Sequence, residues 1–197
     1  MCSSDLYGDA GCEEKKIPGG ATLQYEITLL EMEKEKETWN MDNKEKFEFA
    51  LLKKDQGNTF FKASRFSIAF KRYEAGLNAI KYSTEWEEEE KKQAESLKVT
   101  LNLNMATTKT KLSEWKEALK YAEEALKQEP SNVKALFRKG TVLVSQQEWV
   151  EARTVLNRAL EVDSENKDIK RELVRLQKLQ TAQDTKDKQM FKRMFAK

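Results

Sequence analysis

The sequence contains no histidine among its 197 residues, which excludes several common kinds of active site. Without an imidazole the chain cannot form a Ser-His-Asp or Cys-His catalytic triad, and it cannot ligate a metal through histidine. Its two cysteines, Cys2 and Cys12, are too few for a zinc site and suggest no disulfide framework. We therefore expect no metal and no cofactor, and we expect a cytoplasmic protein that could also enter the nucleus.

Long apolar runs and an excess of one charge are also missing. No run approaches the roughly 18 to 20 apolar residues of a membrane span, and the first residues lack the basic start and apolar core of a signal peptide. Lys and Arg number 36 against 34 Asp and Glu, whereas nucleic-acid-binding domains usually show a clear basic excess. The composition therefore predicts neither a membrane nor a nucleic-acid partner.

Proline occurs only twice and glycine seven times in a chain rich in Glu, Lys, Ala and Leu, which favours an all-α fold. The exception is residues 1–31, where a turn signal at 17–20 precedes alternating apolar and polar residues over 21–30. One strand cannot bury an apolar face alone, so this segment looks like the end of a β-rich domain. Sign-mixed charge over residues 32–46 predicts a linker.

The region 47–165 repeats itself with a period of 34 residues. Units at about 50–83, 99–132 and 133–166 share three slots for small residues, where two helices of a hairpin can cross closely. A 34-residue helix–turn–helix period of this kind is the tetratricopeptide pattern, and three units are enough for a stable stack. The three slots hold Gly57, Ala106 and Gly140, then Ala69, Ala118 and Ala152, then Gly76, Ala125 and Ala159.

Two further segments fit around these repeats. A 15-residue insertion over about 84–98, which carries an acidic run, is expected to lengthen the hairpin of the first repeat. Residues 166–197 are expected to form a C-terminal capping helix, because Ile169, Leu173 and Leu176 recur at i, i+4 and i+7. That apolar stripe should cover the exposed end of the third repeat, as the last face of a solenoid must be covered.

Five polar side chains fall on the first helices of the three repeats, which line one concave groove. Lysine offers a compact positive charge, arginine offers a fork that matches two oxygens, and asparagine amides can donate to a carboxylate or a peptide. Such a pocket suits two neighbouring carboxylates, as in an aspartate at the free end of a chain. The five residues are Lys54, Asn58, Asn104, Lys134 and Arg138.

This set resembles the five-residue carboxylate clamp of tetratricopeptide co-chaperones, matching it in residue type and in repeat. In that family the clamp holds the C-terminal Glu-Glu-Val-Asp tail of the ninety- or seventy-kilodalton heat-shock chaperone. The resemblance therefore implies a co-chaperone adaptor that binds the tail of heat shock protein 90 or of the seventy-kilodalton chaperone. Apolar side chains of the tail would lodge beside the clamp, near Phe61 and Lys62.

The resemblance extends to the large FK-binding immunophilins over nearly the whole chain. The segment from Tyr7 to Glu26 resembles the end of an FKBP-type peptidyl-prolyl isomerase domain, with Tyr7 and Tyr25 at positions of its aromatic pocket. The rest of that pocket would precede residue 1. The alternative function is thus a prolyl isomerase in a longer form of the protein, and the chain alone is expected to be inactive with no catalytic residue.

A third interpretation concerns the C-terminal helix, where residues 186–197 hold five Lys or Arg against one Asp. A basic helix with Met and Phe on one face is a plausible calmodulin target. Ordinary packing and solvation of the last helix explains the same pattern. The apolar pairs are Met190 with Met194 and Phe191 with Phe195.

Overall fold

The computed structural model describes residues 16–20, 26, 28, 36–81 and 86–195. The chain divides into two compact units, 1–36 and 37–197. In the first unit the predicted turn is present, with Gly20 in the left-handed region at φ +68°, where glycine carries no steric penalty. Most of the predicted strand over 21–30 and both pocket residues, Tyr7 and Tyr25, lie outside the described residues.

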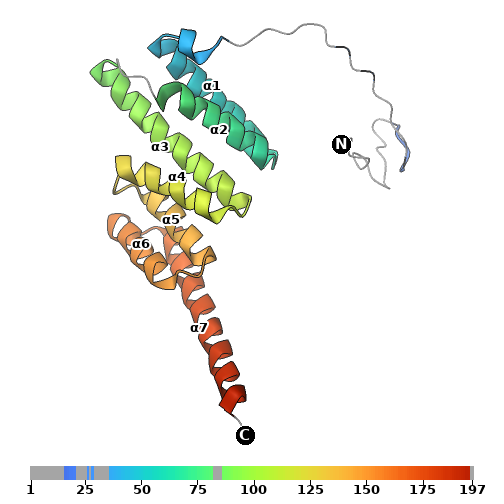
Figure 1. Cartoon of the computed structure of the whole chain (residues 1–197), viewed down its shortest axis with the longest axis vertical. Coiled ribbons are helices and arrows are strands. Elements are labelled where there is room, and N and C mark those ends of the chain that lie inside the picture. Colours follow the sequence, from blue (N-terminus) through green and yellow to red (C-terminus); the bar gives the residue numbers. More distant parts are fainter. Residues whose placement is uncertain (1–15, 21–25, 27, 29–35, 82–85, 196–197) are drawn as a thin grey trace. The chain divides into compact units, whose positions relative to one another are not determined.

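The described part of the second unit consists of a short 3₁₀ turn, Thr38–Asn40, and seven α-helices, which confirms the all-α prediction. Consecutive helices pair as antiparallel hairpins, α1 with α2, α3 with α4 and α5 with α6, and α7 packs against the last hairpin (Figure 1). The helices are α1 Asn43–Lys62, α2 Phe66–Lys81, α3 Glu88–Lys111, α4 Trp115–Gln128, α5 Val133–Ser145, α6 Trp149–Val162 and α7 Lys167–Phe195.

Side-chain caps fix where three of these helices begin. Asp42 and Glu45 form a capping box at α1, in which each carboxylate accepts a backbone N–H of the other residue at 2.8 and 2.9 Å. Asn132 caps α5, and Asn166 caps α7 by accepting from the N–H of Ile169 at 3.2 Å. The cap at Asp42 starts α1 within the stretch predicted to be a linker.

The turn inside each hairpin repeats with the period of the sequence. Ser64, Ser113 and Gln147 occupy the same repeat slot, and all three adopt positive φ, between 58° and 65°. The residue after each donates its N–H back to a carbonyl in the last turn of the preceding helix, as in the 3.0 Å bond from Glu148 to Leu143. This pattern is the Schellman type of helix ending, which turns the chain sharply into the second helix.

The small-residue slots predicted from the sequence are the points where the helices cross. The six alanines in these slots are all fully buried, and the three glycines are buried as well. A Cβ atom on Gly57 would overlap the ring of Tyr73, and one on Gly140 would lie 2.6 Å from Cγ of Leu156. In the third slot, a Cβ on Gly76 would lie 3.1 Å from the backbone oxygen of Ala50. Close helix crossing therefore explains these small residues.

The insertion differs in place from the prediction. The first hairpin ends at Lys81, and the extra residues lengthen the first helix of the second hairpin, where α3 begins at Glu88. The prediction that they lengthen the first hairpin is therefore wrong. The physical reason is that the charged segment has strong helix formers and a triple glutamate in the first turn, which stabilises a helix start.

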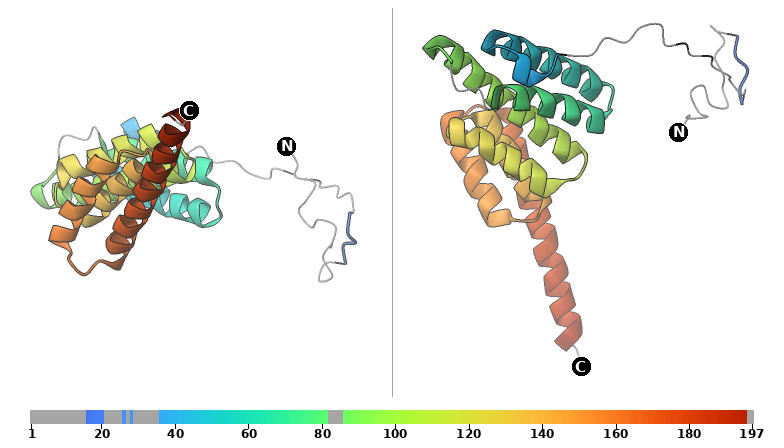
Figure 2. Two further views of the ribbon diagram at one scale, coloured as in Figure 1. Left: turned by 90° about the horizontal axis from the view of Figure 1, so that it is seen from below. Right: turned by 45° about the horizontal axis from the view of Figure 1, so that its top comes forward.

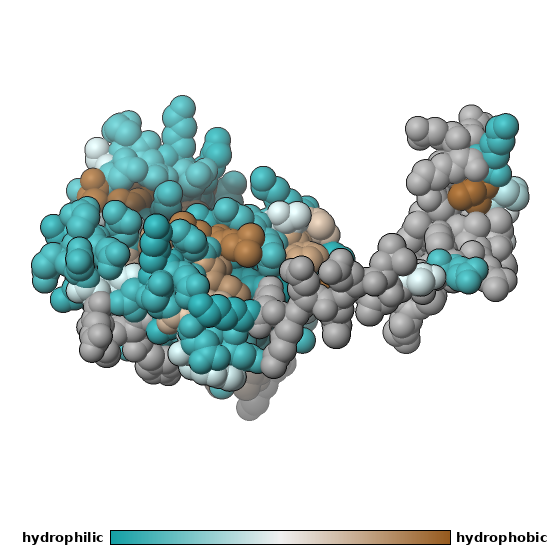
Figure 3. Space-filling view, turned by 90° about the horizontal axis from the view of Figure 1, so that it is seen from above, coloured by the Kyte–Doolittle hydropathy of each residue, from teal (hydrophilic) through white to brown (hydrophobic). Residues whose placement is uncertain are grey.

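The C-terminal helix caps the solenoid as predicted. Ile169 and Leu176 are fully buried against the third hairpin, and Leu173 packs beside them. The second half of α7 extends beyond the other helices of this unit (Figure 2). The face seen in Figure 3 is mainly hydrophilic, with smaller apolar areas between the charged side chains, as expected for a stack whose apolar surface is buried between helices.

Candidate functional site

The first helices of the three hairpins are neighbours: α1 contacts α3, and α3 contacts α5. Each of them carries part of the predicted carboxylate clamp. Two of its members from different repeats meet directly, since Asn104 Nδ2 lies 3.4 Å from Asn58 Oδ1. Lys54 lies one helical turn before Asn58 on α1, and Lys134 and Arg138 lie one turn apart on α5.

Asn58 has a second partner that sequence reasoning did not identify. The hydroxyl of Tyr73, on α2, donates to Asn58 Oδ1 at 2.9 Å. Tyr73 is only 2% exposed, and burial raises its pKa to about 12, so its hydroxyl remains a proton donor at neutral pH. The amide oxygen of Asn58 therefore accepts two hydrogen bonds, from Tyr73 and from Asn104.

The three cations of the set are poorly neutralised by the protein itself. Lys54 has one weak carboxylate neighbour, Asp55, at 3.7 Å. Within the described part of the chain, Lys134 and Arg138 have no carboxylate within 4.0 Å. By contrast, the half-buried Lys139 next to them lies 2.9 Å from Glu123 and 3.0 Å from Glu151. These three side chains therefore carry positive charge that a bound anion could neutralise.

Arg138 is half-buried. Burial lowers its pKa, and the nearby carboxylate of Asp168 at the start of α7 partly opposes that effect. The guanidinium lies 5.7 Å from the ring centre of Phe137, within the range of a cation–π contact. A half-buried guanidinium without an ion-pair partner is an energetically costly arrangement, which a carboxylate ligand would relieve.

A cleft of about 410 Å³ adjoins Lys54. One wall is α1, with Phe47 and Leu51, and the other is α3, including part of the insertion from Lys92 to Leu97. The insertion therefore lengthens the surface beside the proposed anion site.

The two predicted groove neighbours lie at the end of α1. Phe61 is half-buried and packs edge-on against Phe66 with ring centres 5.2 Å apart, and Lys62 is exposed. Phe61 is therefore held by the first hairpin, whereas Lys62 is accessible from solvent.

The predicted apolar pairs at the C-terminal end of α7 are exposed. Met190, Phe191, Met194 and Phe195 are 56% to 76% exposed, and the two phenylalanine rings stack with centres 6.2 Å apart. These residues add nothing to the core of the described structure.

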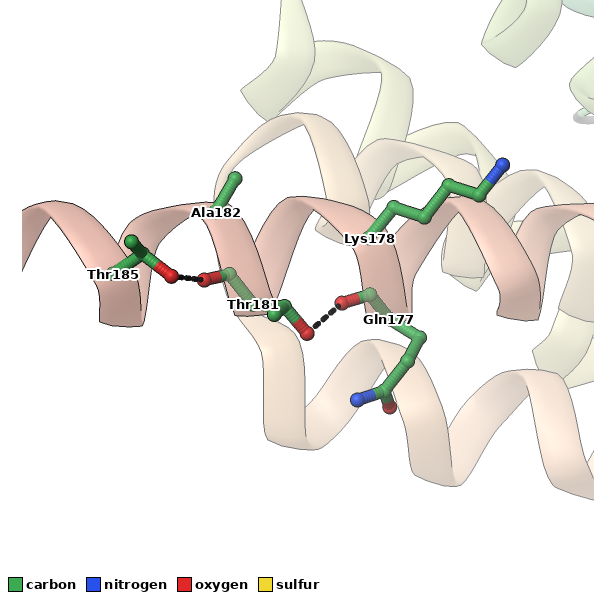
Figure 4. A pocket seen from close by; sticks show the side chains of 5 residues that line it. All are labelled: Gln177, Lys178, Thr181, Ala182 and Thr185. Carbon is green, nitrogen blue, oxygen red and sulfur yellow. Dashed lines mark hydrogen bonds between the residues drawn. The ribbon is translucent and has the colours of Figure 1, made fainter.

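A depression along α7 lies between these exposed residues and the capping stripe (Figure 4). Thr181 and Thr185 each donate to a carbonyl one turn earlier on the same helix, and Gln177 accepts from Arg153 at 2.8 Å. Because these polar groups are satisfied within the protein, the depression is a weaker candidate than the clamp. It is lined by Gln177, Lys178, Thr181, Ala182 and Thr185.

Among the residues that the structure describes, no group of three or more acidic, cysteine or histidine side chains could hold a metal ion. Within the same residues, no helix is both long and apolar enough to traverse a lipid bilayer.

Comparison with known proteins supports the repeat assignment. The sequence model of the tetratricopeptide repeat matches residues 103–167. The C-terminal tetratricopeptide-containing domain of an FK506-binding protein from Plasmodium falciparum superposes with a TM-score of 0.68 at 27% identity, covering 75% of this chain and 99% of that domain. The second such domain of human RPAP3, in complex with the HSP70 peptide SGPTIEEVD, has a TM-score of 0.56 at 25% identity over 67% of this chain and 98% of that one.

Among curated proteins, the peptidyl-prolyl cis-trans isomerase FKBP4 of Bos taurus is 31% identical over 189 residues, which is 96% of this chain and 41% of the relative. This chain thus spans about two fifths of the length of the curated relatives that it matches. It is homologous to FKBP4 over the tetratricopeptide-containing C-terminal part of that protein.

Proposed function

We propose that the chain is a co-chaperone adaptor whose groove binds the acidic C-terminal tail of heat shock protein 90 or of the seventy-kilodalton chaperone. The observation that carries the proposal is that Lys134 and Arg138 have no carboxylate within 4.0 Å among the described residues, while Asn58 and Asn104 on two neighbouring first helices are hydrogen-bonded to each other. A terminal aspartate offers two carboxylates for these donors. The likeness to a domain solved with an HSP70 peptide ending in EEVD gives independent support.

The test is a titration with the peptide SGPTIEEVD and with the same peptide amidated at its C-terminus. We expect micromolar affinity for the free acid, much weaker binding of the amide, and weakening as salt rises, because part of the attraction is between exposed charges. Arg138→Ala should lower the affinity at least tenfold, since it leaves a desolvated carboxylate unpaired. Lys127→Ala on α4 is the matched control, because Lys127 pairs with Glu124 on its own helix. Equal binding of the acid and the amide would refute the proposal.

A second candidate function is prolyl isomerisation in a longer form of the protein. Two observations favour this candidate. Residues 7–26 resemble the end of an isomerase domain, and the chain is homologous to the C-terminal part of an isomerase. The chain alone should not accelerate proline-limited refolding. A refolding rate above the uncatalysed one would contradict this expectation.

A third candidate rests on the exposed Met and Phe residues at the end of α7, which a calcium-loaded calmodulin could cover. A gel shift with and without calcium tests it, and substitution of Met190 and Phe191 by alanine should abolish the shift.

We propose a cytoplasmic location, with entry to the nucleus, where both chaperone classes would be accessible.

A further inference from the structure

Tyr73 lies outside the five-residue clamp, but it is bonded to one of its members. It comes from the second helix of the first hairpin and is 2% exposed, so it cannot itself contact a ligand in the groove. Its hydroxyl nevertheless reaches through to α1 and donates to Asn58 Oδ1 at 2.9 Å. Gly57 makes this approach possible, because a side chain there would overlap the tyrosine ring.

An asparagine amide has one accepting and one donating end, and the donating end is the one that a carboxylate needs. Two donors, Tyr73 and Asn104, bond to the oxygen of Asn58. Its Nδ2 group has no acceptor among the described residues. Among the described residues, the hydroxyl of Tyr73 has no carboxylate to which it donates instead. It therefore donates to the amide oxygen of Asn58, and this favours the amide orientation that leaves Nδ2 available.

The other repeats lack this arrangement. The slot of Asn58 holds Thr107 in the second repeat and Thr141 in the third, and each threonine hydroxyl donates to a carbonyl of its own helix. The slot of Tyr73 holds Ala122 and Leu156, which have no polar group. A tyrosine hydroxyl thus occurs only in the repeat that has an asparagine to receive it.

We propose that Tyr73 is a positioning residue of the anion site, which fixes the side-chain amide of Asn58 so that its NH₂ group faces the carboxylate of a bound tail. This inference rests on the proposed function, because it concerns the same site. The hydrogen bond has the strength of an ordinary neutral one, so its loss should weaken tail binding by about threefold to tenfold.

The experiment measures binding of the peptide SGPTIEEVD to four forms of the full chain: unsubstituted, Tyr73→Phe, Asn58→Ala, and the double variant. Tyr73→Phe should bind less tightly, and it should cause no further loss once Asn58 is alanine. A residue with only a packing role would lower affinity in both backgrounds. Tyr121→Phe is the matched control, because Tyr121 is half-buried and packs on Phe70 at 5.8 Å without contacting the clamp.

A second variant guards against effects on folding. Asn58→Asp keeps two accepting oxygens for Tyr73 and Asn104 but removes the donating group, so it should abolish binding while leaving the melting temperature nearly unchanged. Equal affinity of the unsubstituted chain and Tyr73→Phe would overturn the inference and leave the proposed function intact. Failure of the unsubstituted chain to bind either SGPTIEEVD or the HSP90 peptide SRMEEVD would overturn both.

Discussion

The contact between Gly140 and Leu156 in the third repeat yields a prediction that can be compared with the same two slots in the second repeat. A Cβ atom added to Gly140 would lie 2.6 Å from Cγ of Leu156, far inside van der Waals contact. In the second repeat the same two slots hold Ala106 and Ala122, both fully buried. Alanine is thus tolerated in the first slot where the facing slot is small. We therefore expect Gly140→Ala to be harmful only while Leu156 is present.

The magnitudes follow from three opposing effects. Overpacking at a buried contact costs about 1 to 3 kcal/mol. Alanine gains about 1 kcal/mol over glycine inside a helix. Gly140→Ala alone should therefore destabilise the fold by about 0 to 2 kcal/mol. Leu156→Ala alone opens a cavity and should cost about 2 to 5 kcal/mol. With Leu156 already alanine, Gly140→Ala should become stabilising by about 1 kcal/mol.

The assay is urea unfolding of the unsubstituted chain, the two single variants and the double variant, with helicity as the signal. The double-mutant cycle should give a favourable coupling energy of about 1 to 3 kcal/mol between Gly140 and Leu156. If the two effects simply add within about 0.5 kcal/mol, the glycine is not required by the helix crossing and the packing argument fails.

Four further outcomes are expected. Asp168→Asn removes a negative charge near Arg138, so tail peptides should bind roughly twofold to fivefold tighter by titration. Gln147→Gly should raise the unfolding free energy by up to about 1 kcal/mol in urea, because Gln147 has φ +65°. Burial raises the pKa of Tyr73 to about 12, above the value of about 10 in an unfolded chain. The contribution of Tyr73 to stability is therefore fully present below pH 10 and is lost as the pH rises towards 12. The melting temperature of Tyr73→Phe should fall less over that range than the melting temperature of the unsubstituted chain. Truncation after Gln180 removes no fully buried residue among those that the structure describes, and it should shift the urea midpoint only slightly.

The periodic features of the sequence were enough to predict the fold. The recurring small residues lie at the helix crossings, where an added Cβ would meet the Tyr73 ring at Gly57, the Leu156 side chain at Gly140 and the Ala50 backbone at Gly76. The capping stripe of Ile169 and Leu176 was also predicted from the sequence, because an apolar period of 3.6 at the end of a stack indicates a helix that covers its last face. The insertion was harder to assign, because a charged helical pattern does not say which of two adjoining helices it extends.

The polar site was predicted less completely than the fold. Residue type and repeat slot were enough to select five candidate donors, but they give no information on what lies behind each one. The sequence analysis did not include Tyr73 in the site, and the bond from its hydroxyl to Asn58 is seen only in the structure. A usable signal was present, since that slot is polar in the first repeat and apolar in the other two. Asp168 was missed for a similar reason, because it approaches Arg138 from a different helix.

The repeats assign scaffold and recognition to different slots. Slots at the helix crossings accept only small residues, and slots at the turns all adopt the same left-handed conformation, so these define the path of the chain. Slots on the first helices vary freely: the one that holds Asn104 in the second repeat holds Asp55 in the first and Arg138 in the third. These slots differ in charge between the repeats, although each first helix packs on the next in the same way. Specificity for an anionic ligand therefore lies where the repeats differ, and the scaffold lies where they agree.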